Sequence, residues 1–196
     1  NILPIAYSVF HPLTFTGWLP SFGIGSPQGF DLYLSPLNYL YMLPLSVAQP
    51  LISMVKVTVA LIGMYFFMRQ LGYTWRGSFI AGMSYSMCSV MIMWNGWQHS
   101  TVTMYAPLLF LLLDKLLTKL SVKYYVALAA VIYLMLVAGM PTYAAYFLYL
   151  SGAYMLFYGV RTYHGRPADL AWYIFWFVVS VGIAGLMSLP YTGSLV

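Results

Sequence analysis

Long apolar stretches separated by short basic clusters are the feature that most restricts the fold of this chain. Its 196 residues are 62% hydrophobic and 6% charged, whereas a soluble domain carries roughly 25% charged residues. This composition excludes a water-soluble fold and is typical of a polytopic membrane protein. Apart from Lys56, the basic residues gather at the ends of apolar stretches, as Arg69 with Arg76, Lys115 with Lys119 and Lys123, and Arg161 with Arg166.

The lengths of the apolar stretches predict how many times the chain crosses the membrane. A hydrocarbon core of about 30 Å requires roughly 17 to 25 apolar residues per helix. We therefore expect one all-α membrane domain over residues 1–196, a transmembrane helical bundle with about six spans in residues 47–196. The predicted spans are Val47–Leu71, Ser78–Trp94, Thr101–Leu117, Val122–Gly139, Pro141–Val160 and Leu170–Leu189.

The basic clusters also predict an orientation. Lys and Arg are enriched in short cytoplasmic loops, and placing all three clusters in the cytoplasm makes the six spans alternate in direction. Residues 1–46, the turns at 95–100 and 139–141, and the C-terminal end then lie outside. A net charge of +5 does not indicate nucleic acid here, because the basic residues are not spread over one polar face.

Residues 1–46 are predicted to form an extracytoplasmic loop that lies in the membrane interface. They contain too many Pro and Gly residues to span, yet carry Phe, Tyr, Trp and Leu throughout. Ser35 followed by Pro36 predicts the start of a short helix, which Pro44 ends after about Leu43. Because the chain begins without Met and stops just after an apolar segment, we expect it to be a fragment of a longer protein.

Small residues at helical spacing predict close contacts between helices. Ser78, Gly82 and Ser86 share one helix face, which lets a neighbouring helix approach closely in lipid. Gly182 and Gly185 in the last span suggest a similar contact. The single cysteine, Cys88, lies in an apolar segment and is interpreted as a packing residue.

Lys56 is the most informative single residue. It lies nine residues after the start of its predicted span, about 14 Å deep in the membrane. Inserting a charged side chain near the middle of a bilayer costs on the order of 2.5 to 3.5 kcal/mol of free energy. Lys56 therefore requires a partner or a watery cavity. A lipid phosphate suits the compact ammonium group, and the alternative is a structural ion pair with an acid elsewhere in the protein.

The predicted outer turn after Trp94 is the densest polar and aromatic group on that side. Asn95, Trp97, Gln98 and His99 combine amide groups with aromatic faces, as sugar-binding surfaces do, and an imidazole transfers protons near neutral pH. They are candidate substrate-binding residues. The alternative is an ordinary interfacial turn with tryptophans at the membrane boundary.

The acidic residues give weaker signals. Asp31 is the one acid predicted outside, where it is a weak candidate for a general base or metal ligand, or else a turn residue. Asp114 and Asp169 lie beside basic residues, where local pairing or helix capping explains them. The dispersed His and Asp residues show no metal-ligand spacing, and we find no cofactor motif.

Several short phrases follow one another along nearly the whole chain, namely Gly23–Gly25, Leu34–Asn38, Leu61–Tyr65, Arg69–Gly72, Ser84–Met93, Pro107–Lys115 and Gly139–Ala145. In this order they resemble the YfhO family of bacterial membrane proteins. The resemblance implies an integral-membrane glycosyltransferase of the GT-C type in the bacterial cell membrane. Such an enzyme takes a sugar from a polyprenyl-phosphate carrier and adds it to a cell-envelope polymer such as lipoteichoic acid.

The resemblance also has a departure. The acid expected to act as catalytic base in this group stands just after a first span, and both are expected upstream of Asn1. The role is therefore not transferred to Asp31. Lys56 and Asn38 fall on family-like positions, which adds Asn38 to the candidate substrate-binding residues. A transporter or lipid flippase, and a noncatalytic scaffold for envelope assembly, are the alternative functions.

Overall fold

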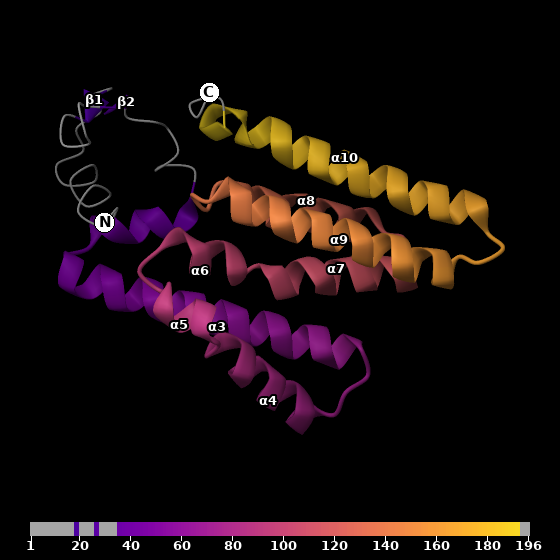
Figure 1. The fold of residues 1–196 in the computed structure, drawn as a ribbon, viewed down its shortest axis with the longest axis horizontal. Coiled ribbons are helices and arrows are strands. Elements are labelled where there is room, and N and C mark those ends of the chain that lie inside the picture. Colours follow the sequence, from indigo (N-terminus) through magenta and orange to yellow (C-terminus); the bar gives the residue numbers. More distant parts are fainter. Residues whose placement is uncertain (1–17, 20–25, 28–34, 193–196) are drawn as a thin grey trace.

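The chain is described by a computed structural model that covers residues 18–19, 26–27 and 35–192, and these form a bundle of helices (Figure 1). A two-residue antiparallel pair, in which Trp18 lies opposite Pro27, precedes the helices. The elements are β1 (Trp18–Leu19), β2 (Ser26–Pro27), the 3-10 helix η1 (Pro36–Met42), α3 (Leu45–Gln70), α4 (Trp75–Ser86), α5 (Ser89–Met93), α6 (Gln98–Thr103), α7 (Ala106–Thr118), α8 (Val122–Leu136), α9 (Pro141–Thr162) and α10 (Pro167–Thr192).

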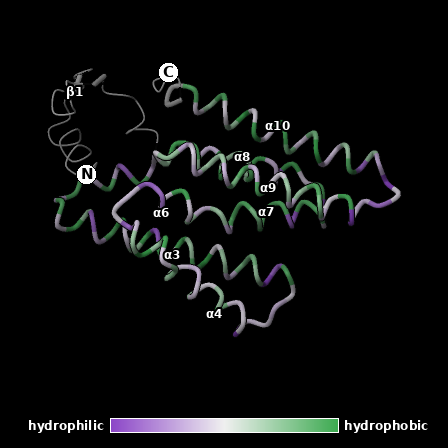
Figure 2. The backbone as a smooth tube through the Cα atoms, viewed as in Figure 1, coloured by the Kyte–Doolittle hydropathy of each residue, from purple (hydrophilic) through white to green (hydrophobic). Residues whose placement is uncertain are grey.

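Three stretches of helix are long and apolar enough to cross a membrane, namely Leu45–Gln70, Gln98–Thr118 and Pro167–Leu189. Hydrophobic residues dominate the lengths of the helices, and hydrophilic residues gather toward their ends (Figure 2). The helical, membrane-compatible class predicted from composition is thus supported. The described helices do not by themselves give six spans, because only these three stretches have the length and apolarity that a span requires.

The basic clusters lie together at one end of the bundle. The connections from α3 to α4 and from α9 to α10 lie on the same side in Figure 1. At the end of α9, the Tyr163 hydroxyl donates to the carbonyl oxygens of Leu116 (3.2 Å) and Leu117 (3.3 Å) near the end of α7. We call this the basic end, and we call the opposite end, with residues 95–100 and 139–141, the turn end.

The helix α7 forms the centre of the bundle. Most of the membrane-length stretch Gln98–Thr118 is buried inside the protein, 67% of its apolar window, whereas the corresponding share is 22% for α3 and for α10. Leu109, Leu113 and Leu116 are fully buried. The helices α3, α8 and α9 pack around α7. The surface of α7 is therefore covered by protein, whereas α3 and α10 each have an apolar face that points outward.

Glycine and proline mark the helix boundaries as predicted. Gly72 and Gly139 have positive φ angles, +91° and +94°, a conformation that costs residues with a Cβ atom. They follow α3 and α8, while Pro141 and Pro167 begin α9 and α10. The short helix predicted after Ser35 is also confirmed, although it is a 3-10 helix and the Ser35 side chain makes no capping hydrogen bond.

The prediction of one continuous span from Ser78 to Trp94 is wrong. The helix stops at Ser86 and a second, five-residue helix starts at Ser89. Cys88 has extended backbone angles there, and its N–H donates to the carbonyl of Tyr85 (3.2 Å). The Tyr85 hydroxyl in turn donates to the Thr103 carbonyl (2.8 Å), which ties the end of α4 to α6. This break redirects the chain toward the turn end.

The small-residue face of α4 packs as predicted. Ser78, Gly82 and Ser86 are buried against α3, and a Cβ atom at Gly82 would lie 2.9 Å from the Leu61 carbonyl oxygen. Gly182 and Gly185, by contrast, have open space where a Cβ atom would be. Within the described residues their spacing therefore does not mark a helix contact.

Candidate functional site

Lys56 is buried near the turn end, and its charge is solvated by the protein. Its side chain is 5% exposed. The Nζ atom donates to the carbonyl oxygens of Asn95 (2.8 Å) and Trp97 (3.1 Å) and to Ser100 Oγ (3.0 Å). Because an ammonium group has three N–H donors, all of them are used. We call this arrangement of Lys56, Asn95, Trp97 and Ser100 the Lys56 clamp.

The clamp explains why the chain turns between α5 and α6. Helix α6 starts after Trp97 without a side-chain cap, and the carbonyl groups of Asn95 and Trp97 just before it accept hydrogen bonds from Lys56. The Ser100 hydroxyl lies 2.9 Å from the Trp97 carbonyl oxygen and 3.3 Å from that of Asn95. One buried charge on α3 thus fixes the backbone of a turn about forty residues later in the chain.

Aromatic side chains surround the clamp. The His99 ring lies 4.6 Å from the Trp94 ring and 4.7 Å from the Tyr143 ring, edge to face with the latter. Trp94 and Trp97 also form an edge-to-face pair and are 41% and 46% exposed. The turn therefore offers two partly exposed indole rings around a buried polar centre.

Two polar atoms in this turn have unused hydrogen-bonding capacity. Asn95 Oδ1 and His99 Nδ1 are buried and have no partner among the residues that the structure describes. The backbone behind them is held, because Thr103 Oγ1 donates to the His99 carbonyl (2.8 Å). Buried polar atoms normally find a protein, water or ligand partner, so these two atoms are unsatisfied in the turn as it is folded.

Gln98 packs against the turn at 139–141. A Cβ atom at Gly139 would lie 2.5 Å from Gln98 Cγ, so only glycine leaves room for the side chain in this position. The turns at 95–100 and 139–141 are therefore in direct contact.

The structure brings together most of the candidate residues from the sequence. Lys56, Asn95, Trp97, Gln98 and His99 lie in one group, although their functional roles remain predictions. Asn38 lies in η1, which packs on the start of α3, and Asp31 lies outside the described residues. The partners Ser100 and Tyr143 were missed, since only the contact between distant segments reveals them.

The Lys56 clamp bears directly on the predicted lipid-phosphate role of Lys56. The ammonium group already has three protein acceptors, so a phosphate oxygen reaches it only by replacing one of them. The Trp97 carbonyl is the longest of the three contacts and belongs to a partly exposed residue. The exchange would therefore occur most easily there.

Asp114 is held by a different partner from the one predicted. Its carboxylate accepts a hydrogen bond from the Tyr154 hydroxyl on α9 (3.0 Å), and the adjacent Lys115 lies over the Tyr124 ring. Among the described residues, no group of three or more His, Cys, Asp or Glu side chains is placed to hold a metal ion.

Comparisons with known proteins add no relative. No family model, curated protein or solved structure matches this chain.

Proposed function

We propose that this chain is part of an integral-membrane glycosyltransferase that uses a polyprenyl-phosphate-linked sugar at the extracytoplasmic face. The observation that carries the proposal is the Lys56 clamp, which holds a turn with two partly exposed indole rings beside a buried cation. The ordered resemblance to the YfhO family supports the same reading. A cell-envelope polymer such as lipoteichoic acid is the proposed acceptor.

The proposal includes a specific membrane arrangement. Helices α8 and α9, together with the broken pair α4 and α5, would complete a GT-C-like bundle of about six spans. The basic end would face the cytoplasm and the turn end the exterior of a bacterial cell. The clustering of the three basic connections at one end of the bundle supports this arrangement.

The turn end suits the two halves of a lipid-linked sugar. Trp97 offers a partly exposed aromatic face to a sugar ring. Asn95 Oδ1 and His99 Nδ1 are buried and unpaired within the described part of the chain, so they would bind its hydroxyl groups only after the turn opens. Lys56 would offset the charge of the lipid phosphate as it departs from the anomeric carbon. A base on the acceptor hydroxyl is also needed, and we expect it outside the described residues.

A transporter or lipid flippase is the second candidate. The chain breaks between α4 and α5, and the turn between α5 and α6 contacts a buried cation. Broken helices around a charged site are common on transport pathways. In proteoliposomes this alternative predicts movement of the lipid-linked sugar between leaflets without transfer to an acceptor.

The deciding experiment measures sugar transfer by the complete protein in proteoliposomes. Removing one charge-stabilising donor typically costs about 100- to 1000-fold in rate, so Lys56→Ala should abolish measurable transfer. Lys56→Arg should recover only part of it, because the planar guanidinium does not reproduce a compact ammonium. Trp97→Ala should lower the affinity for the sugar donor.

Controls separate loss of function from loss of structure. Lys123→Ala removes an exposed charge at the basic end and should leave transfer unchanged. Each variant is also tested for membrane insertion and for a single peak in size-exclusion chromatography. Full sugar transfer by a correctly inserted Lys56→Ala protein would refute the proposed role of Lys56. Full transfer by Trp97→Ala as well would refute the proposed site.

A further inference from the structure

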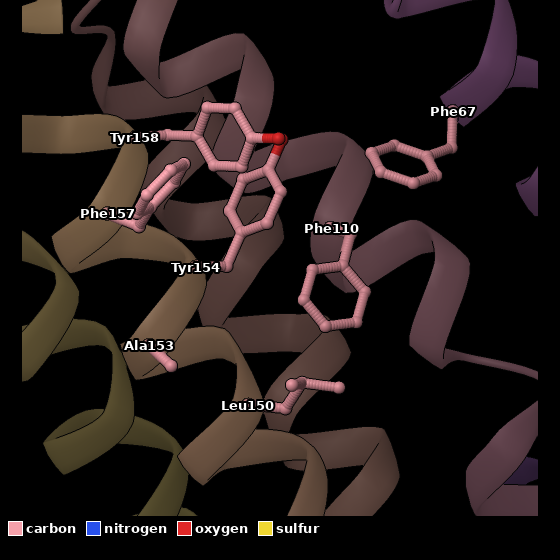
Figure 3. Close-up of a pocket in the computed structure, with 7 residues that line it drawn as sticks. All are labelled: Phe67, Phe110, Leu150, Ala153, Tyr154, Phe157 and Tyr158. Atoms are coloured by element: carbon pink, nitrogen blue, oxygen red, sulfur yellow. The ribbon is translucent and has the colours of Figure 1, made fainter. Parts of the chain in front are cut away.

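A groove on the outside of the bundle lies away from the candidate site. It has a volume of about 450 Å³ and lies between the second half of α3, the first half of α7 and the middle and second half of α9 (Figure 3). Phe67 and Phe110 approach from one side and the α9 residues from the other. The lining is almost entirely apolar, and its residues are Phe67, Phe110, Leu150, Ala153, Tyr154, Phe157 and Tyr158.

Aromatic rings form a continuous wall in this groove. Phe110 lies 6.1 Å from Phe67 and 5.4 Å from Tyr154, whose ring is 4.5 Å from that of Tyr158. The rings and the α9 residues thus line an open apolar groove. The Tyr154 hydroxyl is bound to Asp114, so it is not available to an occupant.

The three helices that line the groove end with basic residues. Arg69, Lys115 and Arg161 each lie in the last turn of their helix, on α3, α7 and α9 respectively. Arg161 is exposed and follows Phe157 and Tyr158 on the same face of α9. The apolar groove thus leads toward positive charge at the basic end.

We propose that this groove binds an acyl chain of an anionic phospholipid from the leaflet beside the basic end. The lipid phosphate would lie beside the exposed Arg161 in the last turn of α9. Anionic lipid surfaces attract such basic groups. The carboxylate of Asp114 is bound to Tyr154. Tyr154 lies seven residues before Arg161 on α9, about 10 Å along the helix, so the negative charge is separated from the proposed phosphate position.

The position of the groove distinguishes this ligand from the lipid-linked sugar. The proposed transfer site is at the turn end, whereas the groove opens toward the opposite end. The inference therefore does not depend on the proposed function. It concerns a structural lipid of the other leaflet.

The test uses the complete protein in nanodiscs with a phosphatidylglycerol that carries a photoreactive group in one acyl chain. After illumination, mass spectrometry should find the label on the α9 peptide from Leu150 to Tyr158 and on peptides with Phe67 or Phe110. Unlabelled phosphatidylglycerol should compete for the site, while phosphatidylcholine with the same chains should compete less well.

Two variants separate the chain from the head group. Ala153→Trp fills the groove and should lower labelling about fivefold, whereas Val126→Trp, at an exposed apolar position of α8, should leave it unchanged. Arg161→Gln should reduce the preference for phosphatidylglycerol over phosphatidylcholine about fivefold, as expected for one basic contact with an anionic lipid. Arg161 is exposed, so this variant decides the matter even if Ala153→Trp does not fold.

Three results would overturn the proposal. The first is a label spread evenly over α3, α8 and α10, and the second is equal competition by the two phospholipids. The third is stronger competition by polyprenyl phosphate than by phosphatidylglycerol, which would assign the groove to the carrier lipid instead.

Discussion

Lys56 illustrates how a charged residue is accommodated when its partners are not charged. The sequence predicts that it needs a partner, and the structure supplies two carbonyl oxygens and a hydroxyl. These partners were not predictable, because every residue carries a carbonyl group and the turn lies about forty residues away. The pairing of Asp114 with Tyr154 was not predictable either, because the two residues are forty positions apart in the sequence.

Gly139 is the residue where the backbone and the candidate site depend on each other. Gly139→Ala should destabilise the protein by about 1–2 kcal/mol through its positive φ angle alone. Displacement of Gln98 by the new Cβ atom should add about 1 kcal/mol. Thermal unfolding in detergent measures the total.

Gly72→Ala is the matched control for this substitution. Gly72 has nearly the same φ angle, but a Cβ atom there meets nothing within 4 Å. It should therefore show the backbone cost without the Gln98 contact. Equal destabilisation by the two variants would mean that the contact between the two outer turns contributes nothing.

At the scale of the elements, glycine and proline residues predicted most helix ends. The boundaries at Gly72, at Gly139 with Pro141, and before Pro167 all follow from residues with unusual backbone preferences. The break after Ser86 had no such signal, since Met87 and Cys88 are compatible with a helix. It results from the tertiary contacts that bring the turn to Lys56.

The contact between α3 and α4 depends on the absence of a side chain at Gly82. Gly82→Ala would place a Cβ atom 2.9 Å from the Leu61 carbonyl oxygen, and neither backbone can yield unless the helices separate. We expect a loss of about 1–3 kcal/mol in the free energy of unfolding. Chemical denaturation followed by circular dichroism in detergent measures this loss.

Gly152→Ala on α9 provides the comparison. Nothing lies within 4 Å of a Cβ atom there, so the substitution should be neutral or stabilise the helix by up to about 1 kcal/mol. If Gly82→Ala were as well tolerated as Gly152→Ala, the close packing of these two helices would be refuted.

At the scale of the whole molecule, composition and charge clusters predicted a helical, membrane-compatible chain with its basic loops together. They did not predict which helix is central. Leu109, Leu113 and Leu116 of α7 are as apolar as the exposed residues of α10. In a bilayer both lipid and protein are apolar surroundings, so hydrophobicity alone does not distinguish a buried helix from a peripheral one.

The orientation of the bundle is tested by labelling single cysteines in intact cells, with Cys88 replaced by Ser. Thr142→Cys, at an exposed position of the turn end, should react with a membrane-impermeant maleimide. Lys119→Cys should react only after the cells are opened. Labelling of Lys119→Cys from the medium would reverse the orientation and place the candidate site on the cytoplasmic side.

The length of α3 changes how far Lys56 lies from water. Its 26 residues extend about 39 Å, which exceeds a hydrocarbon thickness of about 30 Å. The exposed Gln49 lies twenty residues before Arg69, about 30 Å along the helix. If Arg69 lies at one boundary of the hydrocarbon core, Gln49 marks the opposite boundary. The first turn of α3, where Ala48 packs with Tyr41 of η1, then projects above the acyl chains. Lys56 lies only seven residues after Gln49, about 10 Å along the helix. Side chains in a helix point back toward its N-terminus. The ammonium group of Lys56 therefore approaches the depth of the lipid head groups.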